Sequence, residues 1–288
     1  MTRRTLAALL VAVVASIGLV SAPAGADSQR THRLAQAKPT RIVSLSPTAT
    51  EMLYAIGAGR QVKAVDDQSD YPKNAPKTDL SGFNPNVEAI AAYRPDLVVM
   101  SDNSVEDRLK QLGIKVLVQP AAANLNQSYA QIRALGKATG RQSNATRLVD
   151  TIKSGIADVK AQVPKRSKKV TVYYELDDTY FSATSKTFIG QVLSLAGLSN
   201  IADQAQGGAP DYPQLTSEYI VSTSPDYIFL ADGTCCGQTP EVVAARPGWA
   251  NITAVRDKHV FAVNDDLASR WGPRVVDLLR TIVNDTKQ

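Results

Sequence analysis

Glu88-Ala-Ile-Ala-Ala-Tyr-Arg-Pro95-Asp96-Leu-Val98 and Glu218-Tyr-Ile-Val-Ser-Thr-Ser-Pro225-Asp226-Tyr-Ile228 are two copies of one phrase. Both copies follow the pattern Glu-x-Ile-x4-Pro-Asp-x-(Val/Ile), and one copy lies in each half of the chain. Each copy predicts a short helix, a proline that ends it and a buried strand. The repeated phrase therefore predicts two similar lobes, each with a glutamate at the same point.

The sequence on either side of the two phrases alternates between strand and helix patterns. Short apolar runs predict strands at 42–45, 62–65, 97–100, 115–118, 170–174, 227–230 and 260–263. Helical spacing predicts helices at 48–56, 105–112, 127–135, 142–163, 187–196 and 273–284, besides those that begin near Glu88 and Glu218. Residues 66–80 show no such pattern and are expected to form a loop. Strands that alternate with helices indicate parallel sheets with crossover helices, which is an α/β fold.

The start of the chain has the pattern of a secretory signal peptide. Arg3 and Arg4 precede an apolar run, and the small residues Ala24-Gly25-Ala26 follow it, so cleavage is expected after Ala26. We therefore expect export to a periplasmic or extracellular compartment. The predicted division is a signal peptide (1–26), a flexible leader (27–40), an N-terminal α/β lobe (41–141), an interlobe helix (142–164) and a C-terminal α/β lobe (165–288).

Cys235 and Cys236 are the only cysteines, and they are adjacent. Neither lies near the predicted cleavage site, so the sequence predicts no N-terminal lipid anchor. Exported proteins live where thiols tend to oxidise, which favours a vicinal disulfide. Reduced thiols or an external partner explain the pair equally well.

Several classes of function are disfavoured by composition. The net charge of +5 comes from basic residues that are mostly interspersed with acids, so nucleic-acid binding has no support. The chain lacks a nucleophile elbow, a Gly-rich phosphate loop and a His-Glu-x-x-His motif. Its two histidines, His32 and His259, are too few for a triad or a histidine-rich metal site. We therefore predict a protein that is not an enzyme and has no metal centre.

The two glutamates of the repeated phrase allow two interpretations. Glu88 follows Asn86 and Glu218 follows Thr216, so each glutamate would lie in the first turn of a capped helix, where a negative charge stabilises the helix dipole. Two glutamates at equivalent places on two lobes could also meet one basic partner.

Candidate ligand contacts lie in loops next to strands, where open α/β sheets bind ligands. They are Tyr71, Phe83, the pair Tyr180-Phe181 and Trp271, and the segment Asp265 to Arg274 combines charges, an aromatic and a tight turn. Packing under loops would explain any single one of these aromatics, and a solvated helix start would explain Asp265 and Arg274.

The chain resembles the periplasmic substrate-binding proteins of ABC importers that carry cobalamin, haem and ferric siderophores, most of all the cobalamin-binding branch. The resemblance covers nearly all of the chain after the leader. It is strongest at Ser44-Leu-Ser-Pro-x-x-Thr-Glu51, Ser69-Asp-Tyr-Pro72, the two Glu phrases and Arg270-Trp-Gly-Pro-Arg274. It implies two Rossmann-like lobes joined by one rigid helix, with a ligand cleft between them, in a protein that is a monomer.

The resemblance also implies roles for single residues. Glu88 and Glu218 match the family's docking glutamates, which meet arginines of the permease dimer. Phe83, Phe181, Asp266 and Arg270 match cobalamin contacts, and the expected ligand-binding set is Ser46, Gln68, Tyr71, Phe83, Phe181, Asp266, Arg270 and Trp271. The chain departs from the cobalamin pattern at Gln68, Ser101 and Leu267, where aromatics are expected, and at the Cys-Cys-Gly stretch.

The favoured ligand is thus cobalamin or a related corrinoid, with a ferric siderophore or haem as the alternative and no resident cofactor. Tyr71, Tyr180 or Tyr212 could hold haem iron in place of histidine. A secreted α/β enzyme and a ligand sensor are the less favoured functions.

Overall fold

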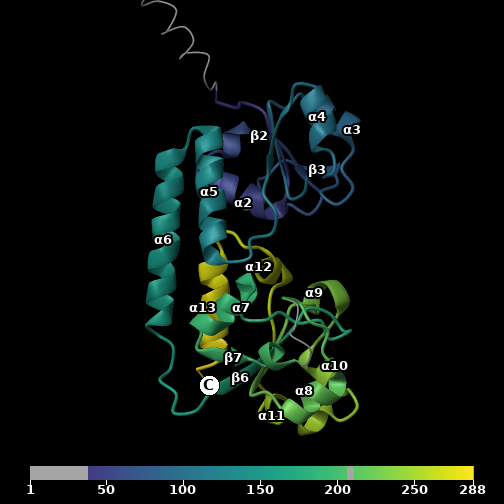
Figure 1. Cartoon of the computed structure of the whole chain (residues 1–288), viewed down its shortest axis with the longest axis vertical. Coiled ribbons are helices and arrows are strands. Elements are labelled where there is room, and N and C mark those ends of the chain that lie inside the picture. Colours follow the sequence, from purple (N-terminus) through teal and green to yellow (C-terminus); the bar gives the residue numbers. More distant parts are fainter. Residues whose placement is uncertain (1–37, 206–210, 288) are drawn as a thin grey trace, which may run out of the picture. The chain divides into compact units, whose positions relative to one another are not determined.

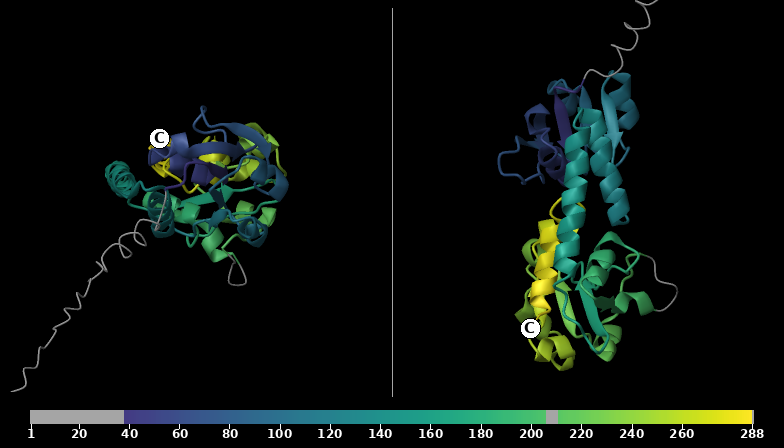
Figure 2. Two further views of the ribbon diagram at one scale, coloured as in Figure 1. Left: turned by 90° about the horizontal axis from the view of Figure 1, so that it is seen from above. Right: turned by 90° about the vertical axis from the view of Figure 1, so that its left-hand side faces the viewer.

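The computed structural model describes residues 38–205 and 211–287, so the predicted signal peptide and most of the predicted leader lie outside it. The described part contains two sheets and the helices around them (Figures 1 and 2). Pro39 and Thr40 already contact the folded part of the chain. The carbonyl of Pro39 accepts a hydrogen bond from the Gln61 side chain, and the backbone N–H of Thr40 donates one to Asp96. No helix of the described residues is long and apolar enough to cross a membrane.

The first sheet belongs to the N-terminal lobe, and all of its strand pairs are parallel. Its order is β3-β2-β1-β4-β5. The strands are β1 (Ile42–Leu45), β2 (Val62–Asp66), β3 (Lys77–Leu80), β4 (Leu97–Met100) and β5 (Lys115–Val118). β1 and β4 are buried along their whole length, as apolar runs covered on both faces should be.

The second sheet belongs to the C-terminal lobe and is also parallel throughout. Its order is β7-β6-β8-β9. The strands are β6 (Val170–Glu175), β7 (Leu198–Asn200), β8 (Tyr227–Leu230) and β9 (Val260–Ala262). Each lobe therefore has the α/β architecture that the alternating pattern predicts, and the fold class is confirmed.

Helices cover the sheets and connect the lobes. Around the first sheet lie α2 (Pro47–Ala55), α3 (Val87–Ala92), α4 (Glu106–Gln111) and α5 (Leu125–Thr139). Then come α6 (Gln142–Lys160), α7 (Phe188–Leu195), α8 (Ser217–Thr223), α9 (Gly233–Cys236), α10 (Pro240–Ala244), α11 (Thr253–Arg256), α12 (Asp265–Ser269) and α13 (Val275–Asp285). α6 packs against α5 and against α13 (Figure 2). Buried side chains from all three helices belong to one hydrophobic core. The 19 residues of α6 correspond to ~29 Å of helix.

The repeated phrase builds the same local structure in both lobes. Asp96 accepts hydrogen bonds from the backbone N–H of Thr40 and of Arg41, and Asp226 accepts one from the backbone N–H of Thr171. Each aspartate thus fixes the start of the neighbouring strand, β1 or β6. The residue before the proline, Arg94 or Ser224, has φ of +47° in both copies. The two phrases are structural equivalents, as their sequence predicts.

The structure corrects several predicted boundaries. Residues 66–80 are not all loop, because Lys77–Leu80 forms edge strand β3, which is partly exposed and lacks an apolar run. Strand β7 and the short helices α9 to α12 were also not predicted, since three to five residues are too few to show a period. The last helix begins at Val275 rather than Pro273, and the helix expected at 127–135 extends from Leu125 to Thr139.

Candidate functional site

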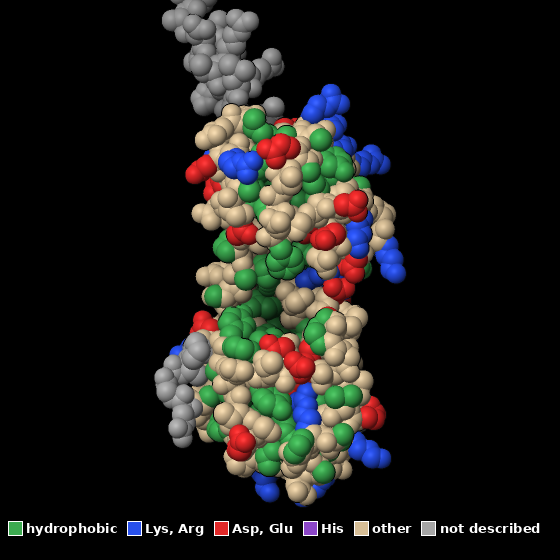
Figure 3. All heavy atoms as spheres, turned by 90° about the vertical axis from the view of Figure 1, so that its right-hand side faces the viewer, with side chains coloured by type: hydrophobic (Ala, Val, Ile, Leu, Met, Phe, Trp, Pro, Cys, Tyr) green, Lys and Arg blue, Asp and Glu red, His purple; other side chains and the backbone are tan. Residues whose placement is uncertain are grey.

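The candidate site lies where the two lobes face each other. A hollow separates the lobes in the space-filling view, with hydrophobic side chains inside it and acidic side chains on both rims (Figure 3). Arg270 follows α12, which comes after β9, and it contacts Gln68 and Asp70, which come after β2. The carboxyl ends of both sheets therefore meet at this place, where open α/β sheets bind ligands.

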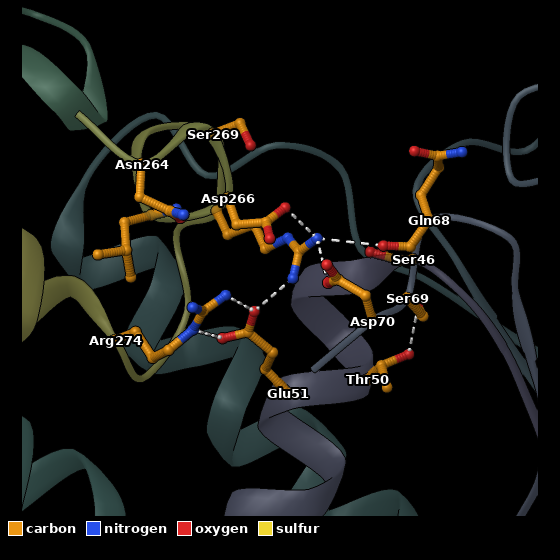
Figure 4. Close-up of polar contacts among 12 residues, drawn as sticks. Ser46, Thr50, Glu51, Gln68, Ser69, Asp70, Asn264, Asp266, Ser269 and Arg274 are labelled. Atoms are coloured by element: carbon orange, nitrogen blue, oxygen red, sulfur yellow. Dashed lines mark hydrogen bonds and ion pairs between the residues drawn. The ribbon is translucent and has the colours of Figure 1, made fainter. Parts of the chain in front are cut away.

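Glu51 of α2 connects the N-terminal lobe to the C-terminal segment. Its residue is only 3% exposed, and its carboxylate accepts hydrogen bonds from Arg270 Nη1 at 2.9 Å and Arg274 Nε at 2.9 Å. A further bond comes from Arg274 Nη2 (Figure 4). Bidentate arginine–carboxylate pairs of this kind fix geometry as well as charge. Glu51 thus orients both arginines.

Arg270 is the centre of the cluster. Besides Glu51, its guanidinium pairs with Asp70 Oδ1 at 2.8 Å and with Asp266 Oδ1, and it donates to the carbonyl of Gln68 at 3.1 Å. The Arg270 side chain is 7% exposed, whereas those of Asp70 and Asp266 are 49% and 36% exposed. The cluster therefore presents carboxylates, not a bare guanidinium, to the solvent.

The charges of the cluster shift one another's pKa. Burial alone would raise the pKa of Asp70, but the hydrogen bond and charge of Arg270 outweigh it, so the pKa of Asp70 is lowered. The pKa of Asp266 is raised, first by burial and then by the adjacent Asp70 carboxyl, against the opposing charge of Arg270. Asp266 is thus the carboxyl of this pair that protonates more easily.

A small hydroxyl network supports the loop that carries Asp70. Thr50 Oγ1 donates to Ser44 Oγ and contacts Ser69 Oγ, both at 2.9 Å, and all three residues are buried. Ser46 caps α2 by accepting a hydrogen bond from Ala49 N. These bonds explain why the Ser-Leu-Ser-Pro-x-x-Thr-Glu stretch positions the site: its hydroxyls hold the loop, and its glutamate holds the arginines.

Several of the predicted ligand residues come together around this cluster. Gln68 and Asp266 contact Arg270 directly, and the Tyr71 ring lies 4.3 Å from the Arg274 guanidinium in a cation–π contact. Trp271 is half-buried, and its Nε1 donates to Gln131 Oε1 at 2.8 Å. Ser46 is buried and acts as a helix cap. Their roles toward a ligand stay predictions.

The two predicted phenylalanines lie apart from the cluster. Phe83 follows β3 and is 91% exposed, so no described neighbour buries its ring. Phe181 is 37% exposed and forms an isolated bridge with Gln214. Tyr180, one of the tyrosines considered for haem iron, instead stacks on Trp249 in the C-terminal lobe.

The two predicted docking glutamates are exposed and are the first-turn residues of capped helices. Asn86 accepts a hydrogen bond from Ala89 N and Thr216 accepts one from Tyr219 N, as predicted for the two caps. Glu88 also pairs with Arg108 at 3.0 Å. Helices α3 and α8 both lie on the side remote from α6 in Figure 1. This placement suits docking to one partner but does not test it.

A second buried polar group, which the sequence did not reveal, lies in the C-terminal lobe. Glu175 ends β6 and forms a bidentate pair with Arg246, with both bonds at 2.6 Å. Asp232 is fully buried, and neither of its carboxylate oxygens has a hydrogen-bond partner among the described residues. Burial, and then the charge of Glu175, raises the pKa of Asp232 to about 7. Asp232 is therefore expected to be largely protonated under mildly acidic conditions.

The adjacent cysteines are the last two residues of the short helix α9, and both are exposed. Their Sγ atoms lie close enough to each other for a vicinal disulfide. The backbone N–H groups of Thr234 and Cys235 donate to the Asp265 carboxylate, which links α9 to α12. The bond itself stays a prediction. Within the described ranges, no three histidine, cysteine or acidic side chains form a group that could hold a metal ion.

The cluster also contains Glu51, Asp70 and Arg274, which the sequence-based set of ligand-binding residues did not include. Asp70 and Glu51 lie inside the Ser69-Asp-Tyr-Pro and Thr-Glu motifs, so the motifs contained the signal. Arg274 was named in the candidate ligand segment Asp265 to Arg274, with a solvated helix start as the alternative, and no pairing was predicted for it. Its pairing with Glu51 joins residues 223 positions apart, which no local pattern can show.

Comparison with known proteins agrees with this architecture. The family model described as "Periplasmic binding protein" matches residues 42–267. An ABC transporter substrate-binding lipoprotein of Bacillus subtilis, itself uncharacterized, is 33% identical over 264 residues, covering 86% of this chain and 82% of the relative. A cobalamin-binding protein of Halobacterium salinarum is 30% identical over 268 residues, covering 90% of this chain and 72% of the relative.

A solved structure shares the fold. It is a possible iron-binding, periplasmic solute-binding protein from Staphylococcus epidermidis, with a TM-score of 0.77 and 27% identity, and it covers 88% of this chain and 100% of its own. The family consists of binding proteins, which confirms the prediction that the chain is not an enzyme. The chain belongs to the periplasmic binding protein family and is an ABC-transporter substrate-binding protein.

Proposed function

We propose that the protein captures cobalamin or a related corrinoid between its lobes and delivers it to an ABC permease. The main support is the cluster around Arg270, which unites residues from the carboxyl ends of both sheets next to a partly apolar hollow. A large, flat ligand with polar side groups fits a hollow with an apolar floor and a polar rim. The cobalamin-binding relative from Halobacterium supports the same ligand.

The ligand is tested by the visible spectrum of the purified protein with cyanocobalamin, haemin and a ferric siderophore, each added in turn and then dialysed. We expect cyanocobalamin to be retained at one equivalent. Retention of haemin or the siderophore alone would overturn the corrinoid part of the proposal. Those ligands are the alternative within the same class, supported by the possible iron-binding relative and by the half-exposed Tyr71 and Tyr212.

We also propose that Glu88 and Glu218 dock the protein to arginines of a permease dimer. Their equivalent positions on two lobes and their exposure support this role. The double variant Glu88→Ala and Glu218→Ala should abolish uptake in cells that express the cognate permease, with ligand affinity unchanged. The matched control is Asp107→Ala, which removes one exposed charge in the first turn of α4. Loss of ligand affinity in the double variant would mean that the glutamates belong to the site or the fold.

We propose further that residues 1–26 direct export and are removed. The Bacillus relative is a lipoprotein, so this class includes lipid-anchored proteins. The comparison therefore does not support the sequence-based exclusion of a lipid anchor, and that exclusion rests only on the position of Cys235 and Cys236. The intact mass of protein prepared from its native membrane or medium would show cleavage after Ala26 and any attached lipid.

A further inference from the structure

We propose that Asp70 and Asp266 are specificity-determining residues that make this site reject anionic ligands and select ligands with uncharged hydrogen-bond donors, such as carboxamides. The inference rests on the proposed function, because it assumes that a corrinoid-like chelate meets the Arg270 cluster. The charges at the site would then explain why the protein binds ligands with carboxamide side groups and excludes ligands with carboxylate side groups.

Carboxylates outnumber guanidinium groups in the cluster. Two guanidinium groups, those of Arg270 and Arg274, face three carboxylates, those of Glu51, Asp70 and Asp266. Arg274 is further covered on one face by the Tyr71 ring. Neither arginine therefore offers an uncompensated positive charge to a ligand. An incoming carboxylate or catecholate would meet an excess of negative charge, which like-charge repulsion makes unfavourable.

The Nη2 atom of Arg270 has more acceptors around it than hydrogens to donate. Its Nη2 donates toward three oxygens: the Gln68 carbonyl at 3.1 Å, Asp70 Oδ1 at 2.8 Å and Asp266 Oδ1. One guanidinium nitrogen of this kind carries only two hydrogens. The acceptors thus exceed the donors, so Asp70 and Asp266 compete for Arg270 and keep acceptor capacity for a donor brought by the ligand.

Asp70 and Asp266 are the carboxylates of the cluster that a ligand can reach. The Glu51 side chain is 1% exposed and cannot reach a ligand, whereas Asp70 and Asp266 are 49% and 36% exposed. Asp70 comes from the N-terminal lobe and Asp266 from α12, so a ligand between the lobes would contact both. A primary carboxamide can donate to these carboxylates. A carboxylate of the ligand can reach Arg270 only by displacing the carboxylate of Asp70 or of Asp266.

The experiment compares two ligands with the same corrin ring and cobalt. Dicyanocobinamide carries amide side chains, and dicyanocobyrinic acid carries carboxylates in their place. We expect wild-type protein to bind dicyanocobinamide about 100-fold more tightly, as measured by absorbance titration at low ionic strength. In Asp70→Asn with Asp266→Asn, which keeps shape and removes both charges, this ratio should fall at least tenfold and the affinity for the carboxylate ligand should rise.

Controls separate this inference from folding and from the proposed function. Each single variant is measured too, together with its unfolding temperature, and Asp158→Asn on the exposed face of α6 is the matched charge control, expected to leave the ratio unchanged. Equal wild-type affinities, or an unchanged ratio in the double variant, would overturn the inference while corrinoid binding stands. Absence of binding to both corrinoids would overturn the proposed ligand and the inference together.

Discussion

Replacing Glu51 with Gln should destabilise the protein more than any exposed charge change, because Glu51 is the shared anion of two arginines. Glutamine has one carbonyl oxygen, so it cannot accept all three hydrogen bonds that Arg270 and Arg274 donate to Glu51. Its NH2 group would also face a guanidinium donor. Removal of one partner from a buried pair costs about 3–5 kcal/mol. Arg270 retains Asp70 and Asp266, so we expect the lower end, about 3 kcal/mol.

Urea denaturation followed by tryptophan fluorescence would measure this loss as a shift of the midpoint at constant slope. Asp277→Asn is the matched control, because Asp277 pairs with Arg280 on the surface, where both side chains are about half exposed. Such surface pairs contribute about 0–1 kcal/mol. A Glu51→Gln variant within about 0.5 kcal/mol of wild type, or a control that costs as much, would refute the claim that Glu51 anchors the two arginines.

Two further predictions concern buried carboxylates. Burial raises the pKa of Asp232 from 3.8 to about 7, so the folded state favours the protonated carboxyl. The contribution of this carboxyl to folding stability is complete below about pH 4 and is lost as the pH rises to about 7. Asp232→Asn should therefore be more stable than wild type at pH 8, by about 1–3 kcal/mol, with a flatter pH profile of the unfolding temperature; a variant less stable at pH 8 would show that Asp232 has a partner there. Asp96→Asn and Asp226→Asn should each cost about 1–2 kcal/mol in thermal unfolding, because both aspartates bind a backbone N–H and a hydroxyl of the adjacent threonine. A large difference between these two variants would contradict the equivalence of the repeated phrases.

Much of the fold could be predicted because its strands are apolar runs that are buried on both faces. Ile42–Leu45 and Leu97–Met100 are examples. Lys77–Leu80 could not be recognised, since an exposed edge strand of mixed polarity has the composition of a loop. Gly233–Cys236 is a single helical turn, too short for any periodicity.

The site was predictable only in part. Asp266 and Arg270 are four residues apart in one conspicuous loop, and the resemblance to known binding proteins selected them. Their partners Glu51 and Asp70 lie 219 and 200 positions from Arg270 in the sequence. Pairing over that separation depends on how the lobes pack, so a single sequence contains no local trace of it. Motif residues such as Glu51 could be noticed, but their role required the structure.

We propose that a corrinoid binds between the lobes at the Arg270 cluster. Hydrogen–deuterium exchange of the protein with and without cyanocobalamin tests it most directly. We expect slower exchange on binding in the segments after β2 and β9, residues 67–76 and 264–274, with little change in α6. Unchanged exchange in both segments at saturating ligand, or protection confined to the outer helices, would contradict it.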